Sequence, residues 1–402
     1  MAGIVIVGAG HAGVKVAASL RTMDPDAPIT LLSAESQIPY HRPPLSKKSV
    51  FDAALPMELL QANGYYEKAN IDLRLNTTVT SINPDVSSVT LADGQQLDYQ
   101  QLVIATGTKV RRLPVPGGER AMSVYTYADI QTLGPRLQSA NRIAVIGGGF
   151  IGCEIAAGAL KIGKQVSLLI TGPRALRKSV APILGETVTK LHRQQSMDIR
   201  TGCQVLAITE QGVQTNQGFV QADLIISGIG AQANMQLAQA ADLTTGHGIL
   251  VDEFGRTSHS HIYAVGDVAE FPYGGDLLRL ESIQNATDQG ANVAANIIAE
   301  RHHQAPKAYT PTPWFWSDQG DLKLQMAGLG NLDAEHKVLP GNTPNNLTVV
   351  HLSKGRMMAV DTLNMPANHL AARKLLEMKK PITWAMIEAC DFDLKKLFKQ
   401  LR

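Results

Sequence analysis

The chain has 402 residues, of which 44% are hydrophobic and 18% are charged, and its formal net charge is +2. This length supports two or three domains with separate cores, and the composition excludes an intrinsically disordered chain. The near-neutral charge gives no indication of nucleic-acid binding, and the N-terminus shows no secretory signal. We therefore expect a cytoplasmic globular protein with no nucleic-acid partner.

An apolar strand and a glycine-rich turn open the chain. Residues 4–7 read Ile-Val-Ile-Val, and residues 8–13 read Gly-Ala-Gly-His-Ala-Gly ahead of a helix-like apolar run. Such a turn lets the backbone approach a pyrophosphate, which then binds at the helix N-terminus. A second predicted strand, 29–32, ends near Glu35, whose carboxylate is placed to accept from an adenosine ribose hydroxyl. The sequence therefore predicts a dinucleotide-binding fold.

Two prolines follow in the segment 39–47. The pair Pro43-Pro44 predicts an extended loop that presents the cationic side chains of Arg42 and Lys47. These charges suit a pyrophosphate and a reduced flavin, although an ordinary solvated loop is the alternative. Further strands are predicted at 71–75, 79–82, 89–91 and 102–105, with a hairpin turn at 93–94 and a domain crossover at 113–117.

A second copy of the glycine fingerprint lies near the middle of the chain. A predicted strand at 143–146 leads into Gly-Gly-Gly-Phe-Ile-Gly at 147–152, and strands at 166–170 and 224–227 complete the unit. The sequence therefore predicts an internal duplication of nucleotide-binding folds. The apolar stretch 143–160 is long enough to span a membrane, but its glycines and Glu154 favour a buried strand, turn and helix. We expect no membrane span.

The remainder of the chain adds one more candidate site residue. A buried strand is predicted at 262–267 and ends in the carboxylate of Asp267, ahead of a helix-like run at 282–301. Asp267 suits a ribityl or phosphate-proximal hydroxyl, and a helix-capping aspartate is the alternative. A third domain starts at Trp314 and ends in a basic helical tail. The three cysteines, Cys153, Cys203 and Cys390, form no paired or metal-ligand motif, so we expect buried thiols and no metal site.

Seven short motifs carry a family resemblance. They are V-G-A-G-H-A-G at 7–13, R-P-P-L-S-K at 42–47, A-T-G at 105–107, G-G-G-F-I-G-C-E at 147–154, A-V-G-D at 264–267, L-E-S at 280–282 and P-W-F-W-S-D-Q at 313–319. With them the chain resembles, over essentially its whole length, the FAD-dependent NAD(P)H ferredoxin reductases of bacterial oxygenase systems. This group is similar to rubredoxin and putidaredoxin reductases and lies in the pyridine nucleotide-disulfide oxidoreductase superfamily, here without the redox disulfide.

The resemblance implies an α/β fold with two Rossmann-like nucleotide-binding domains, as in glutathione reductase, and a C-terminal α+β interface domain. We expect an FAD-binding domain at 1–112 and 243–312, an NAD(P)H-binding domain at 113–242 and the interface domain at 313–402.

The resemblance also implies roles for individual residues. Lys47 is expected near the flavin and paired with Glu154, both as catalytic residues, because a cation stabilises the reduced flavin and a buried lysine needs a partner. Glu281 is expected near the nicotinamide and Trp316 near the flavin ring, with a core aromatic as the alternative for Trp314 or Trp316. The expected cofactor-binding residues are Gly8, Gly10, His11, Ala12, Gly13, Glu35, Arg42, Lys47, Val79, Ala105, Thr106, Gly107, Gly147, Gly149, Ile151, Gly152, Glu154, Ile170, Thr171, Arg174, Lys178, Gly228, Asp267, Glu281 and Trp316.

Coenzyme choice depends on the end of the predicted strand 166–170. Ile170 stands where an NADH-preferring member usually has a glutamate that accepts from the ribose 2′-hydroxyl. The residues that follow, among them Thr171, Arg174, Arg177 and Lys178, are a set that tolerates or even favours a 2′-phosphate. The alternative is that Arg174 and Lys178 only contact the pyrophosphate. We expect NADH to be favoured, because the family usually prefers it.

The implied activity is electron transfer from NAD(P)H through FAD to a small acidic ferredoxin of the [2Fe–2S] type or a rubredoxin, feeding an aromatic-ring dioxygenase or a cytochrome P450. A rubredoxin reductase or a diaphorase is the alternative enzyme, and an NADH-responsive interaction protein like apoptosis-inducing factor is the alternative of another class. Residues 354–402 carry ten Lys or Arg and five acids, a net charge of +5. This asymmetry indicates either a surface that steers an acidic partner or a solvated face.

Overall fold

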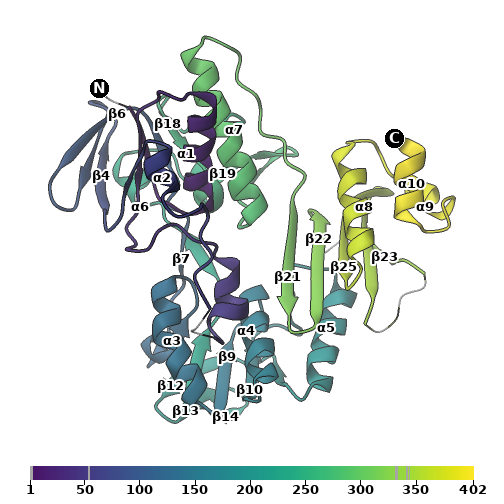
Figure 1. The fold of residues 1–402 in the computed structure, drawn as a ribbon. Helices are drawn as coiled ribbons and strands as arrows, with labels where there is room; N and C mark the ends of the chain where they lie inside the picture. The colour runs from purple at the N-terminus through teal and green to yellow at the C-terminus, as the bar shows by residue number, and fades with distance from the viewer. Residues whose placement is uncertain (1–2, 53–54, 331–333, 341–342, 344) are drawn as a thin grey trace. The chain divides into compact units, whose positions relative to one another are not determined.

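The computed structural model describes residues 3–52, 55–330, 334–340, 343 and 345–402. The chain divides into two compact units, shown in Figure 1. The first comprises residues 1–41, 57–109 and 231–311, and the second comprises 42–56, 110–230 and 312–402. Among the described residues, no helix is long and apolar enough to cross a membrane.

The first unit is an α/β fold. Its helices are α1 (His11–Met23), α2 (Tyr65–Lys68), α6 (Gln236–Ala240), α7 (Ile283–Arg301) and the 3-10 turn η3 (Gly266–Val268). Its strands are β1 (Gly3–Val7), β2 (Ile29–Leu32), β3 (Ile71–Arg74), β4 (Val79–Asn83), β5 (Ser88–Leu91), β6 (Gln96–Ile104), β7 (Thr108–Val110), β16 (Ala231–Ala233), β17 (Ile249–Leu250), β18 (Ile262–Ala264), β19 (Ala269–Tyr273) and β20 (Asp276–Leu278).

A seven-stranded sheet forms the centre of this unit. Its order is β3-β2-β1-β6-β5-β4, with β18 paired to β6. Strands β1, β2, β3, β6 and β18 pair in parallel, and β4, β5 and the first half of β6 pair antiparallel. The central strand β1 is buried on both faces, which explains its continuous apolar run. The strands predicted in this part of the chain and the turn at 93–94 are confirmed, with two differences in bounds: β6 begins earlier than expected, and β18 ends at Ala264, because Asp267 lies in the 3-10 turn η3.

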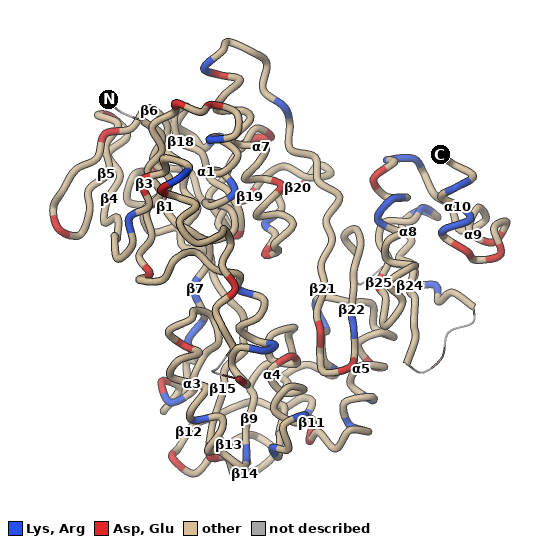
Figure 2. Tube along the Cα trace, viewed as in Figure 1, with Lys and Arg blue, Asp and Glu red and all other residues tan. Residues whose placement is uncertain are grey.

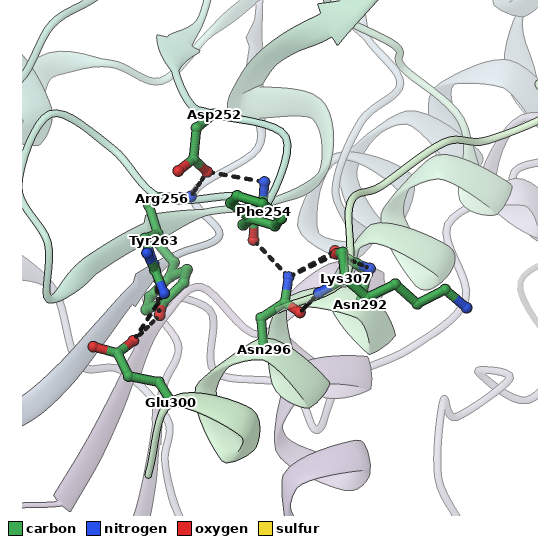
Figure 3. Close-up of polar contacts among 8 residues, drawn as sticks. All are labelled: Asp252, Phe254, Arg256, Tyr263, Asn292, Asn296, Glu300 and Lys307. Carbon is green, nitrogen blue, oxygen red and sulfur yellow. Dashed lines mark hydrogen bonds and ion pairs between the residues drawn. The ribbon is translucent and has the colours of Figure 1, made fainter. Parts of the chain in front are cut away.

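Helix α7 packs beside α1, and polar contacts hold its C-terminal half (Figure 3). Tyr263 of β18 donates its hydroxyl to Glu300 of α7 at 2.5 Å. Asn296 of α7 donates to the backbone carbonyls of Phe254 and Lys307 at 3.0 and 3.1 Å. Buried polar groups need such partners, so this helix is fixed against the sheet that carries the first fingerprint.

The second unit contains two kinds of sheet. Its helices are η1 (Leu45–Ser49, a π-helix), η2 (Gly118–Arg120, a 3-10 turn), α3 (Tyr127–Ser139), α4 (Phe150–Lys161), α5 (Pro182–Gln194), α8 (Pro366–Glu377), α9 (Trp384–Glu388) and α10 (Leu394–Leu401). Its strands are β8 (Met122–Ser123), β9 (Arg142–Ile146), β10 (Gln165–Ile170), β11 (Asp198–Thr201), β12 (Val205–Thr209), β13 (Gly212–Thr215), β14 (Gly218–Gln221), β15 (Leu224–Ser227), β21 (Trp314–Gln319), β22 (Leu322–Gly328), β23 (Glu335–Val338), β24 (Leu347–Ser353) and β25 (Arg356–Leu363).

The sheet that carries the second glycine fingerprint has the order β11-β10-β9-β15-β8, and its strands are parallel. It repeats the arrangement of β3, β2, β1 and β6 in the first unit, which confirms the predicted duplication. The C-terminal sheet has the order β21-β22-β25-β24-β23 and is antiparallel. It begins at Trp314, and α8, α9 and α10 bury apolar residues against it, as predicted for a third region with a helical tail.

The prediction of an extended loop at Pro43-Pro44 is wrong. Pro44 has φ −61° and ψ −24°, and the π-helical turn η1 follows it directly. Proline fixes φ near the helical value and lacks only an N–H that the first helical turn leaves unpaired, so it starts a helix as well as it breaks one. Lys47 therefore projects from a helical turn rather than from an extended segment.

Candidate functional site

The first fingerprint has the geometry that a pyrophosphate site needs. Gly8 has φ +109°, and a Cβ there would lie 2.3 Å from the carbonyl oxygen of Ala105. A Cβ on Gly13 would lie 1.9 Å from the carbonyl oxygen of Gly8. At Gly10 no described atom lies within 4 Å of an added Cβ, and no described side chain caps α1. The helix N-terminus therefore faces open space at the one glycine that is free of such contacts.

Two more predicted motifs meet this turn inside the first unit. The backbone N–H of Ala105 donates to Val7 at 2.8 Å, which brings the Ala-Thr-Gly exit of β6 beside β1. At Gly266 an added Cβ would lie 2.9 Å from the Cβ of Ala12, so the turn before Asp267 packs on the start of α1. Asp267 lies in the 3-10 turn η3, whereas Ser282 is the residue that caps α7.

The other expected residues of this unit have protein partners. Glu35 follows β2 and accepts from the Tyr40 hydroxyl at 2.6 Å. Thr106 exchanges two hydrogen bonds of 2.9 Å with Asn234, and Gly107, in the same turn, accepts from the backbone N–H of Asn234. Glu281 pairs with Arg279 at 2.7 Å.

Two further positions, His11 and Val79, complete the predicted set in this unit. His11 Nε2 lies 3.4 Å from His41 Nδ1, at the first residue of α1. Arg279 also donates to the backbone carbonyl of Asp267 at 2.8 Å, so it links Asp267 to Glu281. Val79 is buried at the start of β4 and contributes packing.

The second fingerprint repeats the first almost atom for atom. Gly147 has φ +114°, and a Cβ there would lie 2.3 Å from the carbonyl oxygen of Gly228. A Cβ on Gly152 would lie 2.0 Å from the carbonyl oxygen of Gly147, whereas no described atom is within 4 Å at Gly149. Ile151 follows at the start of α4 and is exposed. Each unit therefore carries one complete nucleotide-binding turn.

The expected coenzyme loop follows β10. Ile170 is the last residue of β10, as predicted, and its side chain fills the space that a Cβ on Gly148 would need. The backbone N–H of Leu176 donates to the carbonyl of Gly148 at 2.7 Å, so the loop folds back over the fingerprint. Arg174 lies across Gly185 of α5, and Thr171 and Lys178 are exposed.

Lys47 and Glu154 form a pair in the second unit. Lys47 Nζ lies 2.9 Å from Glu154 Oε1, the pairing that the resemblance implies. Glu154 is buried in α4 and receives two further hydrogen bonds, from Ser46 at 2.5 Å and from Ser317 at 2.6 Å. A buried carboxylate needs such compensation. Burial and, to a smaller extent, the charge of Glu154 raise the pKa of the neighbouring Cys153 thiol to about 12, so this thiol stays protonated.

Two expected residues of this unit remain, Arg42 and Trp316. Arg42 donates to the backbone carbonyl of Tyr125 at 2.7 Å, and its guanidinium lies 4.9 Å from the centre of the Tyr125 ring. Trp316 is half-buried on β21 and stacks on Trp314 with ring centres 5.5 Å apart. All three cysteines are free and buried, as predicted, and among the described residues no His, Cys, Asp or Glu cluster is suited to a metal.

Sequence reasoning missed several residues that complete these sites. Ser46 stands beside Lys47 in the Arg-Pro-Pro-Leu-Ser-Lys motif, and Ser317 lies in the Trp-Phe-Trp-Ser-Asp-Gln motif. Both motifs were named from the sequence, but neither serine was assigned a role. The period-2 alternation of β21, which buries Ser317 and Gln319, is the signal that identifies Ser317. Asn234 had no local signal, because its partner Thr106 lies 128 residues away. Arg279 lies two residues before Glu281, but its bond to the backbone carbonyl of Asp267 had no sequence signal.

The sequence matches two known protein families. Residues 2–290 match the family described as pyridine nucleotide-disulphide oxidoreductase, and residues 314–398 match the family described as reductase C-terminal. The chain belongs to the pyridine nucleotide-disulphide oxidoreductase family. This membership agrees with the two glycine fingerprints, one in each unit.

Relatives and solved structures extend the match to nearly the whole chain. The chain is 36% identical to rhodocoxin reductase of Rhodococcus erythropolis, over 98% of this chain and 93% of the relative. It is 37% identical to the ferredoxin–NAD(+) reductase component of the anthranilate 1,2-dioxygenase system of Burkholderia cepacia, over 92% of this chain and 93% of the relative. The ferredoxin reductase for the CYP199A2 system of Rhodopseudomonas palustris superposes with a TM-score of 0.92 at 33% identity, over 98% of each chain.

Proposed function

We propose that the chain is an FAD-dependent NAD(P)H:ferredoxin oxidoreductase that supplies electrons to an oxygenase. The observation that carries this proposal is the combination of two nucleotide-binding turns with full-length similarity to ferredoxin reductases of oxygenase systems. The family uses FAD and a pyridine nucleotide, and the residues fit both. Gly10 and Gly149 each leave room for a pyrophosphate at an uncapped helix N-terminus.

The two turns receive different nucleotides. We infer that FAD binds the fingerprint of the first unit, with Glu35 toward the adenosine ribose and Asp267 toward the ribityl chain. The coenzyme binds the fingerprint of the second unit, with Ile170, Thr171, Arg174 and Lys178 near its adenosine ribose. The domain boundaries 1–112 with 243–312, 113–242 and 313–402 belong to the same proposal, as does the cytoplasmic location.

FAD supplies the chemistry that side chains lack, because it takes two electrons as hydride and releases them singly. The protein residues position the cofactor and neutralise its charge. Lys47 would supply a cation to a reduced cofactor that gains negative charge, and Glu154 holds that cation in one orientation through its 2.9 Å contact. Trp316 and Glu281 are proposed to border the flavin ring and the nicotinamide. NADH is the favoured coenzyme, consistent with NAD(+) in the name of the Burkholderia relative.

An acceptor panel tests the proposal and separates its rivals. NADH oxidation by the purified flavoprotein would be measured with a [2Fe–2S] ferredoxin, a rubredoxin and a small quinone at matched concentrations. We expect the ferredoxin to give the highest kcat/KM. A higher value with rubredoxin would favour a rubredoxin reductase, and activity with the quinone alone would favour a diaphorase. A reduced flavin that persists for minutes beside oxidised ferredoxin would instead favour an NADH-responsive interaction protein.

A further inference from the structure

Strand β21 presents alternate residues to the nucleotide-binding part of its own unit. Successive side chains of a strand point to opposite faces. On one face, Phe315 contacts α4, Ser317 contacts Glu154 of α4, and Gln319 contacts His192 of α5. Ser317, Gln319 and His192 are all 0% exposed. Polar side chains this deeply buried persist only when they are hydrogen-bonded, so their connection has a structural or functional purpose.

These residues form one continuous chain of hydrogen bonds. His192 Nε2 lies 2.9 Å from Gln319 Oε1, Gln319 Nε2 lies 3.3 Å from Ser317 Oγ, and Ser317 Oγ lies 2.6 Å from Glu154 Oε1. The same carboxylate oxygen contacts Lys47 Nζ at 2.9 Å. This series of hydrogen bonds therefore extends from the last turns of α5, through β21, to Lys47 of η1.

The direction of every bond in this chain is determined at the Glu154 end. Glu154, paired with Lys47, is a carboxylate and only accepts, so the Ser317 hydroxyl donates to it. The Ser317 oxygen is then left to accept from the amide nitrogen of Gln319, which turns the amide oxygen of Gln319 toward His192. His192 must therefore carry its proton on Nε2.

We propose that His192, Gln319 and Ser317 are positioning residues: they fix the orientation in which the Glu154 carboxylate contacts Lys47. Each donates toward the carboxylate, so the bonds polarise one another, stabilise the ionised form of Glu154 and fix its orientation against the lysine ammonium. Burial lowers the pKa of His192 and outweighs its hydrogen bonds with Gln319 and Gln195, which raise that pKa, so the ring is neutral near pH 7 and adds no competing charge. The kinetic consequence rests on the proposed function, whereas the proton position does not.

The proton position is tested directly on the holoprotein. With ¹⁵N-labelled histidine, the two ring nitrogens of a neutral imidazole have different chemical shifts in each tautomer. We expect His192, identified by the resonance lost in His192→Gln, to be neutral and protonated at Nε2 at pH 7. Protonation at Nδ1 instead, or on both nitrogens, would overturn the directed chain.

The positioning role is tested by the rate of flavin reduction with NADH and no protein acceptor, so a failure to reduce ferredoxin leaves this test intact. Ser317→Ala should lower the limiting rate about tenfold, the usual effect of a lost hydrogen bond to a charged group, with an unchanged half-saturating NADH concentration. His192→Leu should lower it less, and His192→Gln, which retains an N–H donor, should restore it.

A matched control separates positioning from packing. Thr362 is also a buried hydroxyl of the C-terminal sheet, and it donates to the carbonyl of Gln325 outside this chain of bonds. Thr362→Val should lower thermal stability without changing the rate of flavin reduction. A wild-type rate in Ser317→Ala, or an equal loss of rate in Thr362→Val, would overturn the proposal.

Discussion

Gly10 and Gly149 occupy equivalent places in the two fingerprints. Each has extended backbone, with φ −77° and −79°, that any residue adopts, and neither has a described atom within 4 Å of an added Cβ. Valine at either position therefore fits the protein and collides only with a bound pyrophosphate. We expect Gly10→Val to reduce the bound FAD to less than about a tenth of one per chain while the protein stays folded.

Gly149→Val is the matched control for that experiment. It should retain FAD and lose binding of the pyridine nucleotide, measured by absorbance and by equilibrium titration. Full flavin content in Gly10→Val would show that the first fingerprint does not bind FAD. Gly8→Val should behave differently from both, because positive φ and the contact with Ala105 make it unfold the first unit.

We propose that Ile170, the last residue of β10, determines the choice of coenzyme. Ile170→Glu places a carboxylate at the strand end, where it accepts from the ribose hydroxyls of NADH and repels a 2′-phosphate. The ratio of kcat/KM for NADH over NADPH should rise by about 10- to 100-fold, which corresponds to about 1–3 kcal/mol. Lys178→Gln serves as a comparison that removes a cation without adding an acceptor. A ratio that does not change in Ile170→Glu would place the adenosine ribose elsewhere.

At the level of single elements, helix α8 carries a pH-sensitive contact. His369 is buried, edge-on to Trp314, and its burial, together with the charge of Arg373, lowers its pKa to about 4 from an ordinary 6.5. Between these values the unfolded chain binds a proton that the folded chain does not, so stability falls as pH drops below about 6.5.

We expect this histidine to cost about 1 kcal/mol of unfolding free energy between pH 7 and pH 5, after discounting for solvent screening. Urea denaturation of the wild type and of His369→Gln at both pH values isolates the effect, because other buried histidines contribute equally to both proteins. An identical loss of stability in the two proteins would contradict the assignment to His369.

The elements also show what the sequence alone predicts. Strands β1 and β9 and their glycine turns were predictable because period, glycine positions and spacing are local signals. The π-helical turn η1 was not predicted, because the pair Pro43-Pro44 indicates an extended loop, whereas the φ of proline also suits the start of a helix. His192 carried no signal, because its partner Gln319 lies 127 residues away and only tertiary packing brings them together.

On the scale of the whole molecule, charge is concentrated at the C-terminus. Figure 2 shows Lys and Arg along α8 and α10, and Lys395, Lys396 and Lys399 are all exposed on α10. Lys396 pairs with Asp391 at 2.6 Å, and such exposed pairs are weak enough to leave the lysine available to a partner. We expect ferredoxin-dependent turnover to fall steeply with salt, and NADH oxidation with an uncharged quinone to change little.

Replacing Lys395, Lys396 and Lys399 with Gln should raise the apparent KM for ferredoxin several-fold and flatten the salt dependence. The matched control replaces Lys15, Lys68 and Lys307, which are exposed on the first unit and carry the same total charge. A salt slope that is unchanged in the α10 variant would place the docking surface elsewhere, for example around Arg42, Lys47 and Lys48.

The proposed function requires that electrons pass from NADH through FAD to a small iron–sulfur protein. The most direct measurement mixes the purified flavoprotein anaerobically with NADH and excess oxidised [2Fe–2S] ferredoxin and follows both absorption spectra in one experiment. We predict that the flavin is reduced first and that two ferredoxins are then reduced for each NADH consumed. A flavin that NADH bleaches while the ferredoxin stays oxidised, or a purified protein that binds no FAD, would contradict the account.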